Sequence, residues 1–153
     1  MNNREAAEFA FSSFQKFLKK NEIDTINGEI HSDVLVHHDA PNGNLRLSYA
    51  LADHGFRLKA FCVVVMSDPY KGKPCFDVGI STFHKFRRQG HANSLLKKVI
   101  DELKNGLIRN GINEFYIDLK VDSDNEASKN LCKKFSDEEI NKDNGVIFLK
   151  LIK

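Results

Sequence analysis

The sequence has 153 residues, of which 41% are hydrophobic and 29% are charged, with 12 phenylalanines and no tryptophan. This length and balance are typical of one globular domain that buries its own core, and they exclude a chain that is disordered throughout. The formal net charge of +2 is small, whereas a phosphate-backbone binder concentrates positive charge on one face. We therefore predict one domain over residues 1–153, with nucleic acid not an expected partner.

The cysteine pattern and the hydropathy narrow the class of protein further. Cys62, Cys75 and Cys132 are odd in number and widely spaced, so they indicate neither a disulfide framework nor a CxxC metal or redox motif. No segment resembles a signal peptide, and no run approaches the roughly 18 apolar residues that a membrane span needs. We expect a cytoplasmic protein with reduced thiols, no metal site and no membrane partner.

The first half of the chain reads as one helix followed by strands. Apolar residues recur at helical spacing from Ala7 to Leu18, which predicts an amphipathic helix. The pattern then changes to that of strands, with short turn-like separators that suit antiparallel hairpins. The predicted strands cover 29–37, 45–52, 56–66 and 75–82. The continuous apolar run from Phe61 to Met66 indicates a central strand that is covered on both faces.

The helical period returns after the fourth strand. One apolar stripe runs from Leu95 to Leu107, which predicts a long helix that begins just beyond Gly90. The next predicted strand covers 114–121. A helical crossover of this length makes that strand parallel to the one that ends at Thr82.

The remaining elements are a third helix and a hairpin. Ser123 to Glu126 reads as a capping box, in which the serine and glutamate side chains would satisfy open backbone donors at the helix start. Asp143-Asn144-Gly145 is a turn signal between apolar segments. We therefore predict a terminal hairpin of strands 138–141 and 146–152.

A family resemblance appears where strand, turn, long helix and strand follow one another. The turn Arg87-Arg88-Gln89-Gly90-His91-Ala92, with Leu95-Leu96 after it, resembles the acyl-CoA-binding signature of the GNAT acyltransferase superfamily. The resemblance covers about residues 75–136. It implies a mixed α/β fold of three layers, with a twisted mixed sheet of about six to seven strands, a splayed parallel pair and helices on both faces.

The same turn has physical properties that suit a diphosphate. A helix start presents unpaired backbone N–H groups and the positive end of the helix dipole. Gly90 and Ala92 are small enough for backbone amides to approach phosphate closely. A glycine at a strand-to-helix turn is also an ordinary feature of protein structure, so this turn alone does not establish phosphate binding.

The resemblance implies a site for acetyl-CoA as co-substrate. The amides of residues 88–93 would hold the pyrophosphate, and the backbone of residues 80–82 would pair with the pantetheine arm as an added strand. Asn125 matches the family's asparagine at the start of the next helix, and Ser128 lies one turn further on. The predicted cofactor-binding residues are Ile80, Ser81, Thr82, Arg87, Arg88, Gln89, Gly90, His91, Ala92, Asn93, Asn125 and Ser128.

The sequence departs from the family at residues that would transfer protons. Cys132 stands where many relatives carry a tyrosine, so it is the candidate proton donor, although a buried cysteine is often just a small apolar residue. Lys120 stands where some relatives carry a glutamate. Asp77, Asp118 and His84 are candidate bases, because they lie near the ends of the two relevant strands.

The expected function is transfer of an acetyl group from acetyl-CoA to a primary amine of a small molecule or a protein. Cys132 and Lys120 leave a second interpretation open, a non-catalytic regulator that binds acyl-CoA. A third is a toxin-like acetyltransferase that modifies aminoacyl-tRNA, which would need a basic groove beside the thioester. No motif identifies the acceptor, and the oligomeric state stays open, a homodimer included.

Overall fold

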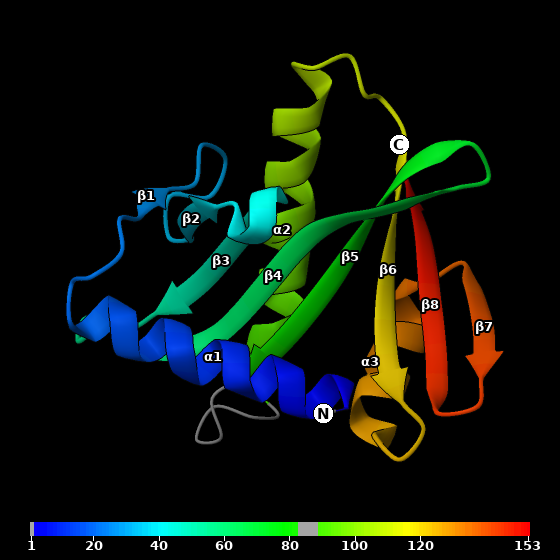
Figure 1. The fold of residues 1–153 in the computed structure, drawn as a ribbon, viewed down its shortest axis with the longest axis horizontal. Coiled ribbons are helices and arrows are strands. Elements are labelled where there is room, and N and C mark those ends of the chain that lie inside the picture. Colours follow the sequence, from blue (N-terminus) through cyan, green and yellow to red (C-terminus); the bar gives the residue numbers. More distant parts are fainter. Residues whose placement is uncertain (1, 83–88) are drawn as a thin grey trace.

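The computed structural model describes residues 2–82 and 89–153, with the backbone alone described for Thr82. These residues form one eight-stranded sheet in the order β1-β2-β3-β4-β5-β6-β8-β7. The elements are α1 (Asn3–Lys19), β1 (Ile26–Asn27), β2 (Leu35–Asp39), the 3-10 turn η1 (Pro41–Gly43), β3 (Arg46–Ala52), β4 (Leu58–Tyr70), β5 (Lys73–Thr82), α2 (His91–Ile108), β6 (Phe115–Asp122), α3 (Glu126–Phe135), β7 (Glu138–Lys142) and β8 (Gly145–Ile152) (Figure 1).

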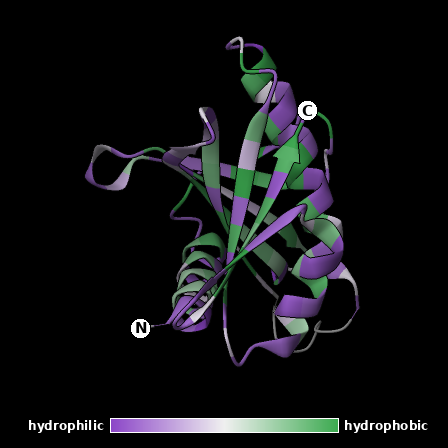
Figure 2. Cartoon of the chain, turned by 90° about the vertical axis from the view of Figure 1, so that its right-hand side faces the viewer, coloured by the Kyte–Doolittle hydropathy of each residue, from purple (hydrophilic) through white to green (hydrophobic). Residues whose placement is uncertain are grey.

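The three layers predicted from the resemblance are confirmed. The helix α1 lies on one face of the sheet, and α2 and α3 lie on the other (Figure 2). The sheet has eight strands rather than six to seven. No helix in the described part of the chain is long and apolar enough to cross a membrane.

Local turn chemistry explains the antiparallel half of the sheet. The Asp53 carboxylate accepts hydrogen bonds from the amides of Gly55 and Arg57, each at 2.9 Å, which closes the β3–β4 turn. Lys71 and Gly72 join β4 to β5 with positive φ angles of 49° and 75°. Such turns match the twist of paired strands. The helical crossover α2 then makes β6 parallel to β5, as predicted.

Two apolar cores hold the helices against the sheet, and β4 contributes to both. Cys62 and Val64 face the core beneath α2 and α3, whereas Phe61 faces the core beneath α1. The Phe61 ring packs on those of Phe11 and Phe14, with centroids 6.3 and 4.7 Å away. The prediction that this apolar run is a central strand is therefore confirmed. Its last residue, Met66, is not covered, because it is 63% exposed.

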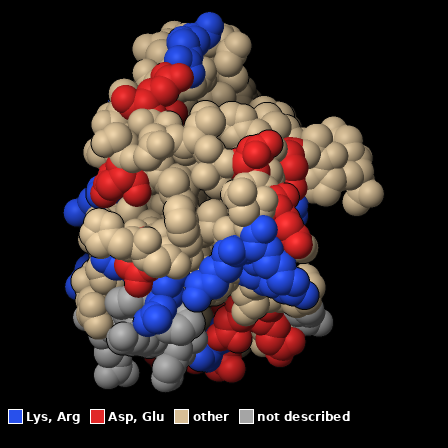
Figure 3. Space-filling view, turned by 90° about the vertical axis from the view of Figure 1, so that its left-hand side faces the viewer, with Lys and Arg blue, Asp and Glu red and all other residues tan. Residues whose placement is uncertain are grey.

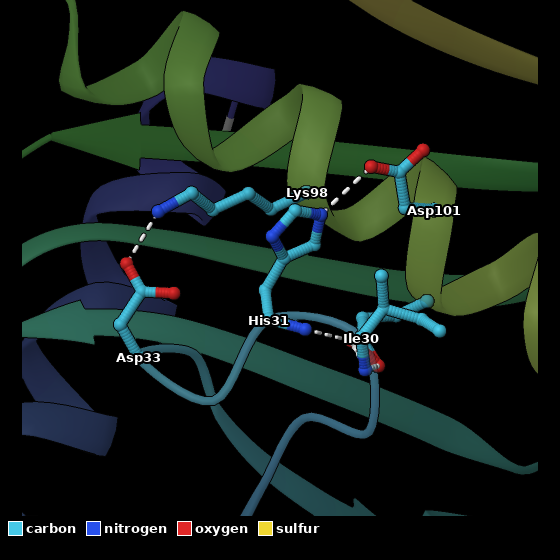
Figure 4. Close-up of polar contacts among 6 residues, drawn as sticks. Ile30, His31, Asp33, Lys98 and Asp101 are labelled. Carbon is cyan, nitrogen blue, oxygen red and sulfur yellow. Dashed lines mark hydrogen bonds and ion pairs between the residues drawn. The ribbon is translucent and has the colours of Figure 1, made fainter.

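The predicted strand 29–37 is wrong over most of its length. Residues 28–34 form a loop that is tied to α2, and β2 begins only at Leu35. The Glu102 carboxylate accepts hydrogen bonds from the amides of Ile30 and His31 at 3.0 to 3.1 Å. An ion pair between Lys98 and Asp33 and a 2.7 Å contact between His31 Nε2 and Asp101 add to this attachment (Figure 4). The Glu102 carboxylate thus accepts hydrogen bonds from amides that would bond to a neighbouring strand if this segment were itself a strand.

The predicted capping box is also wrong, because α3 starts later. Asn125 is the N-cap, and its side-chain oxygen accepts a hydrogen bond from the Ser128 amide at 3.3 Å. The Ser123 amide instead donates to the Asn144 carbonyl at 3.2 Å. The terminal hairpin of β7 and β8 is confirmed.

The loop 28–34 depends on a glycine. Gly28→Ala is expected to lower the free energy of unfolding by about 1–3 kcal/mol, because the added carbon would lie 2.6 Å from the His31 carbonyl oxygen and 2.7 Å from Oε2 of Glu102. Gly106→Ala in α2 is the control, since its nearest contact is an Arg109 nitrogen at 3.9 Å. Urea denaturation measures both. A Gly28→Ala protein as stable as the control would contradict the proposed clash.

Candidate functional site

The central feature of the sheet is an opening between β5 and β6. These strands pair in parallel only through Cys75↔Tyr116, Phe76↔Ile117 and Asp77↔Asp118. Beyond that point each strand continues while bonded to its outer neighbour, β5 to β4 as far as Thr82 and β6 to β8 as far as Asp122. The two strands therefore diverge into a V-shaped opening (Figure 1). The predicted splayed pair is confirmed.

The helix that follows β5 begins at the wide end of this opening. Because β5 and β6 are parallel, their carboxyl ends and the starts of α2 and α3 lie at one edge of the sheet. Gly90 is the N-cap of α2, with a φ of 77°, and a side chain added there would meet no described atom within 4 Å. The first turn of α2 carries no acidic residue. This arrangement suits an anion.

The predicted cofactor-binding residues fall into three groups around the opening. The backbone of Ile80 to Thr82 forms the unpaired inner edge of β5, and the Ser81 hydroxyl lies 3.4 Å from the Ala7 carbonyl of α1. Gln89 and Gly90 directly precede α2, and His91 to Asn93 begin its first turn. Asn125 and Ser128 form the first turn of α3, beyond the end of β6.

Three of the predicted cofactor-binding residues need separate comment. Arg87 and Arg88 lie outside the described residues. Gln89 lies beside His91, with 3.4 Å between Oε1 and Nε2. His84, a candidate base, also lies outside the described part of the chain.

Two carboxyl groups meet at the narrow end of the opening, a pairing that the sequence did not reveal. Asp77 and Asp118 are register partners in the last pair before the strands diverge, and their side chains are close enough to hydrogen-bond if one is protonated. The Lys120 ammonium lies 3.1 Å from Oδ2 of Asp77. On the other side, the Ser67 hydroxyl and the Cys75 thiol each lie 3.4 Å from Oδ2 of Asp118.

The environment of Asp118 favours its protonated form. The residue is 6% exposed, and its Oδ1 has no hydrogen-bond donor among the described residues. Burial, followed by repulsion from Asp77, raises the pKa of Asp118 to about 6, although Lys120 opposes this. Burial would lower the pKa of Lys120, but its hydrogen bond to Asp77 raises it overall, so this ammonium stays charged.

Cys132 lies in the core rather than in the opening. Its side chain is 3% exposed and packs with the cluster beneath α2 and α3. Burial raises the pKa of its thiol to about 11. A thiol so buried resembles a small apolar residue, and its predicted role as a proton donor stays a prediction.

Comparison with known proteins identifies the fold. No protein-family model matches the chain, and no curated protein matches it. Among solved structures, the acetyltransferase of the GNAT family from Streptococcus pneumoniae has a TM-score of 0.50 and 19% identity, covering 74% of this chain and 70% of that chain. Arabidopsis thaliana NAA60, solved in complex with a bisubstrate analogue, has a TM-score of 0.50 and 16% identity, with coverages of 72% and 76%. This chain has the GNAT acetyltransferase fold, as the sequence resemblance predicted.

The pKa of Asp118 predicts how stability depends on pH. The folded-state pKa of about 6 lies above the ordinary value of 3.8, so the native state holds this proton longer than the unfolded chain does. Stability contributed by this group is therefore lost as the pH rises from about 4 to 6. Asp118→Asn removes that loss. Above pH 6 its free energy of unfolding is therefore expected to exceed that of the wild type by about 1–3 kcal/mol.

Urea denaturation between pH 4 and pH 8 tests this prediction. Asp68→Asn, at an exposed position of β4, controls for the loss of one carboxylate. The stability difference between Asp118→Asn and the wild type should grow across the window. A difference that is the same at every pH would show that Asp118 does not titrate as described.

Proposed function

We propose that this chain is an acetyltransferase that moves an acetyl group from acetyl-CoA to a primary amine. The opening between β5 and β6 supports this most directly, because it combines an unpaired strand edge, an uncapped helix start and a carboxyl pair. An extended arm can pair with the free edge of β5 as an added strand. The bound co-substrate supplies an activated thioester.

The residues around the opening fit acetyl-CoA in shape and charge. The backbone of Ile80 to Thr82 would hold the pantetheine arm, and the amides of Gly90 to Asn93 would hold the pyrophosphate. The side chains of Asn2 and Asn125 cap the N-termini of α1 and α3. Gly90, the N-cap of α2, has no side chain that could do so. The start of α2 is thus better suited than the other two helix starts to bind an outside anion. Arg87, Arg88, Asn125 and Ser128 remain predicted contacts.

The carboxyl pair would carry the proton transfer that an amine acceptor needs. An acceptor enters as an ammonium and must lose a proton before its nitrogen can attack a carbonyl carbon. Asp118 has a pKa of about 6, so at neutral pH its carboxylate is the candidate to accept that proton. Asp77 raises the pKa of this carboxyl group and Lys120 lowers it, so these two neighbours tune its charge.

The two alternatives differ from this proposal in what can be measured or seen. A non-catalytic regulator would bind acetyl-CoA without releasing free thiol when an amine is present. An enzyme acting on aminoacyl-tRNA would need a basic groove. On the face at which α1 ends, Figure 3 shows a band of Lys and Arg side chains with Asp and Glu side chains above and below it. That face carries both signs, whereas the third interpretation depends on the surface beside the opening, where Arg87 and Arg88 lie outside the described residues.

Substitution at Gly90 tests the cofactor site. Gly90→Glu is expected to weaken acetyl-CoA binding by at least about 100-fold, because a carboxylate there repels phosphate and covers the amides. Gly111→Glu at the other end of α2 is the matched control, since Gly111 has a similar φ of 79° and equally open surroundings. Calorimetry with acetyl-CoA measures both variants. Equal affinities for the two would remove the cofactor assignment.

Two further variants separate the candidate proton carriers. Asp118→Asn is expected to lower kcat by about 100-fold, as loss of a general base does. Cys132→Ala should lower stability by leaving a small cavity, with kcat near that of the wild type. Thiol release from acetyl-CoA in the presence of an amine is the readout. The reverse pattern, with Cys132→Ala inactive and Asp118→Asn active, would assign proton transfer to the thiol.

A further inference from the structure

The β4–β5 hairpin ends in a tip, residues 70–73, that is attached to β6 and β7 by side chains. The Tyr70 ring packs on the ring of Tyr116 in β6, with centroids 4.9 Å apart and an interplanar angle of 84°. The Tyr70 hydroxyl donates a hydrogen bond to the Glu138 carboxylate of β7 at 3.2 Å, and the Lys71 ammonium lies 2.6 Å from the same carboxylate. In Figure 1 the tip crosses β6 and β8 near the C-terminus.

Two prolines separate this tip from the rest of the hairpin. The β4–β5 register shifts between Ser67 and Tyr70, where Asp68 and Pro69 stand opposite Pro74 alone. A proline has no N–H to give to a ladder, and an extra residue bends the strand that carries it. The ladder therefore loses backbone hydrogen bonds on both strands at one point, and the tip can move about that point as a unit.

The Tyr70 side chain lies over the approach to the carboxyl pair. Asp118, Leu149 and Glu138 are register partners in one row across β6, β8 and β7. Tyr116 precedes Asp118 by two residues, so both side chains point to the same face of β6. Tyr70 contacts Tyr116 with its ring and Glu138 with its hydroxyl, and it therefore reaches the row of the carboxyl pair.

The groups beneath the tip are buried. Cys75, Tyr116 and Leu149 are 3%, 7% and 3% exposed, and they form an apolar cluster against which Tyr70 packs. Oδ1 of Asp118 is buried as well, without a donor in the described part of the chain. A buried oxygen that lacks a donor is costly, so water or an amine that reached Asp118 would satisfy it better than the closed arrangement does.

We propose that residues 70–73 are a flap that moves about the proline hinge and opens the carboxyl pair to the acceptor amine. The contacts that close the flap suit such motion, because the Lys71–Glu138 ion pair is partly exposed and such pairs are weak. Tyr70 and Glu138 are then positioning residues, which set how often the flap is open and touch neither the amine nor the thioester. The access of the amine rests on the proposed function, whereas the motion itself does not.

The Cys75 thiol, beneath the flap, reports its opening. Burial raises the pKa of the Cys75 and Cys132 thiols alike to about 11, so a difference in their alkylation rates reflects access rather than acidity. Cys62, in the core beneath α2, is a second reference. Iodoacetamide, with peptide mass spectrometry as the readout, should modify Cys75 at least about tenfold faster than the other two. Equal rates for all three would show that only unfolding of the whole domain exposes them, and would refute the flap.

Removing the Glu138 carboxylate should loosen the flap. Glu138→Ala is expected to raise the alkylation rate of Cys75 by about tenfold, with the rates of Cys62 and Cys132 unchanged, because it removes both polar contacts that close the flap. It should lower the KM for the amine by a similar factor and leave the KM for acetyl-CoA unchanged. Glu139→Ala, at an exposed position on the other face of β7, is the control. A Cys75 rate that is the same in both variants would overturn the proposal.

Labelling and turnover together separate this inference from the proposed function. A Cys75 rate that responds to Glu138→Ala, with no thiol release from acetyl-CoA and any amine, would support the flap and refute the transferase. Thiol release with Cys75 no more reactive than Cys132 in the wild type and in Glu138→Ala would support the transferase and refute the flap.

Discussion

The early end of the β5–β6 ladder is the constraint on which the rest of the structure depends. Backbone groups in a sheet normally pair, yet these two strands part after Asp77 and Asp118. Each strand is held by its outer neighbour, so the inner edges cannot close without breaking other ladders. Like charges directly opposite one another also disfavour pairing at that point. Gly79, two residues on, adds no side chain to fill the gap.

The helix α1 braces the opening from one side. Asp122, at the end of β6 and 8% exposed, accepts hydrogen bonds from the first amides of α1, and Ser81 of β5 lies against the Ala7 carbonyl. One helix thus touches both arms of the V, while α2 and α3 cover the opposite face (Figure 2). An opening that is held in this way is formed before a ligand arrives, so binding does not carry the free-energy cost of rearranging the sheet.

The sequence predicted those parts of the fold that depend on local signals. The stripe of α2, the glycine at its start and the turn before β8 are short-range patterns, and each was confirmed. The loop 28–34 was missed because its amides are paired by Glu102, about seventy positions away. The site was predictable in part, because the order of strand and helix located the opening. No sequence pattern shows that the crossover through α2 places Asp77 directly opposite Asp118.

Lys120 shows why matching a family signature residue by residue underestimates a site. Taken from the sequence, it is a lysine where relatives carry a glutamate, which suggests a missing base. In the structure its ammonium lies against Asp77, and Asp77 lies against Asp118, so the positive charge offsets one of two crowded carboxylates. The raised pKa of Asp118 then comes from its burial and from Asp77, while Lys120 limits the rise. The register between β5 and β6 thus brings together a charged cluster that no single position of the sequence reveals.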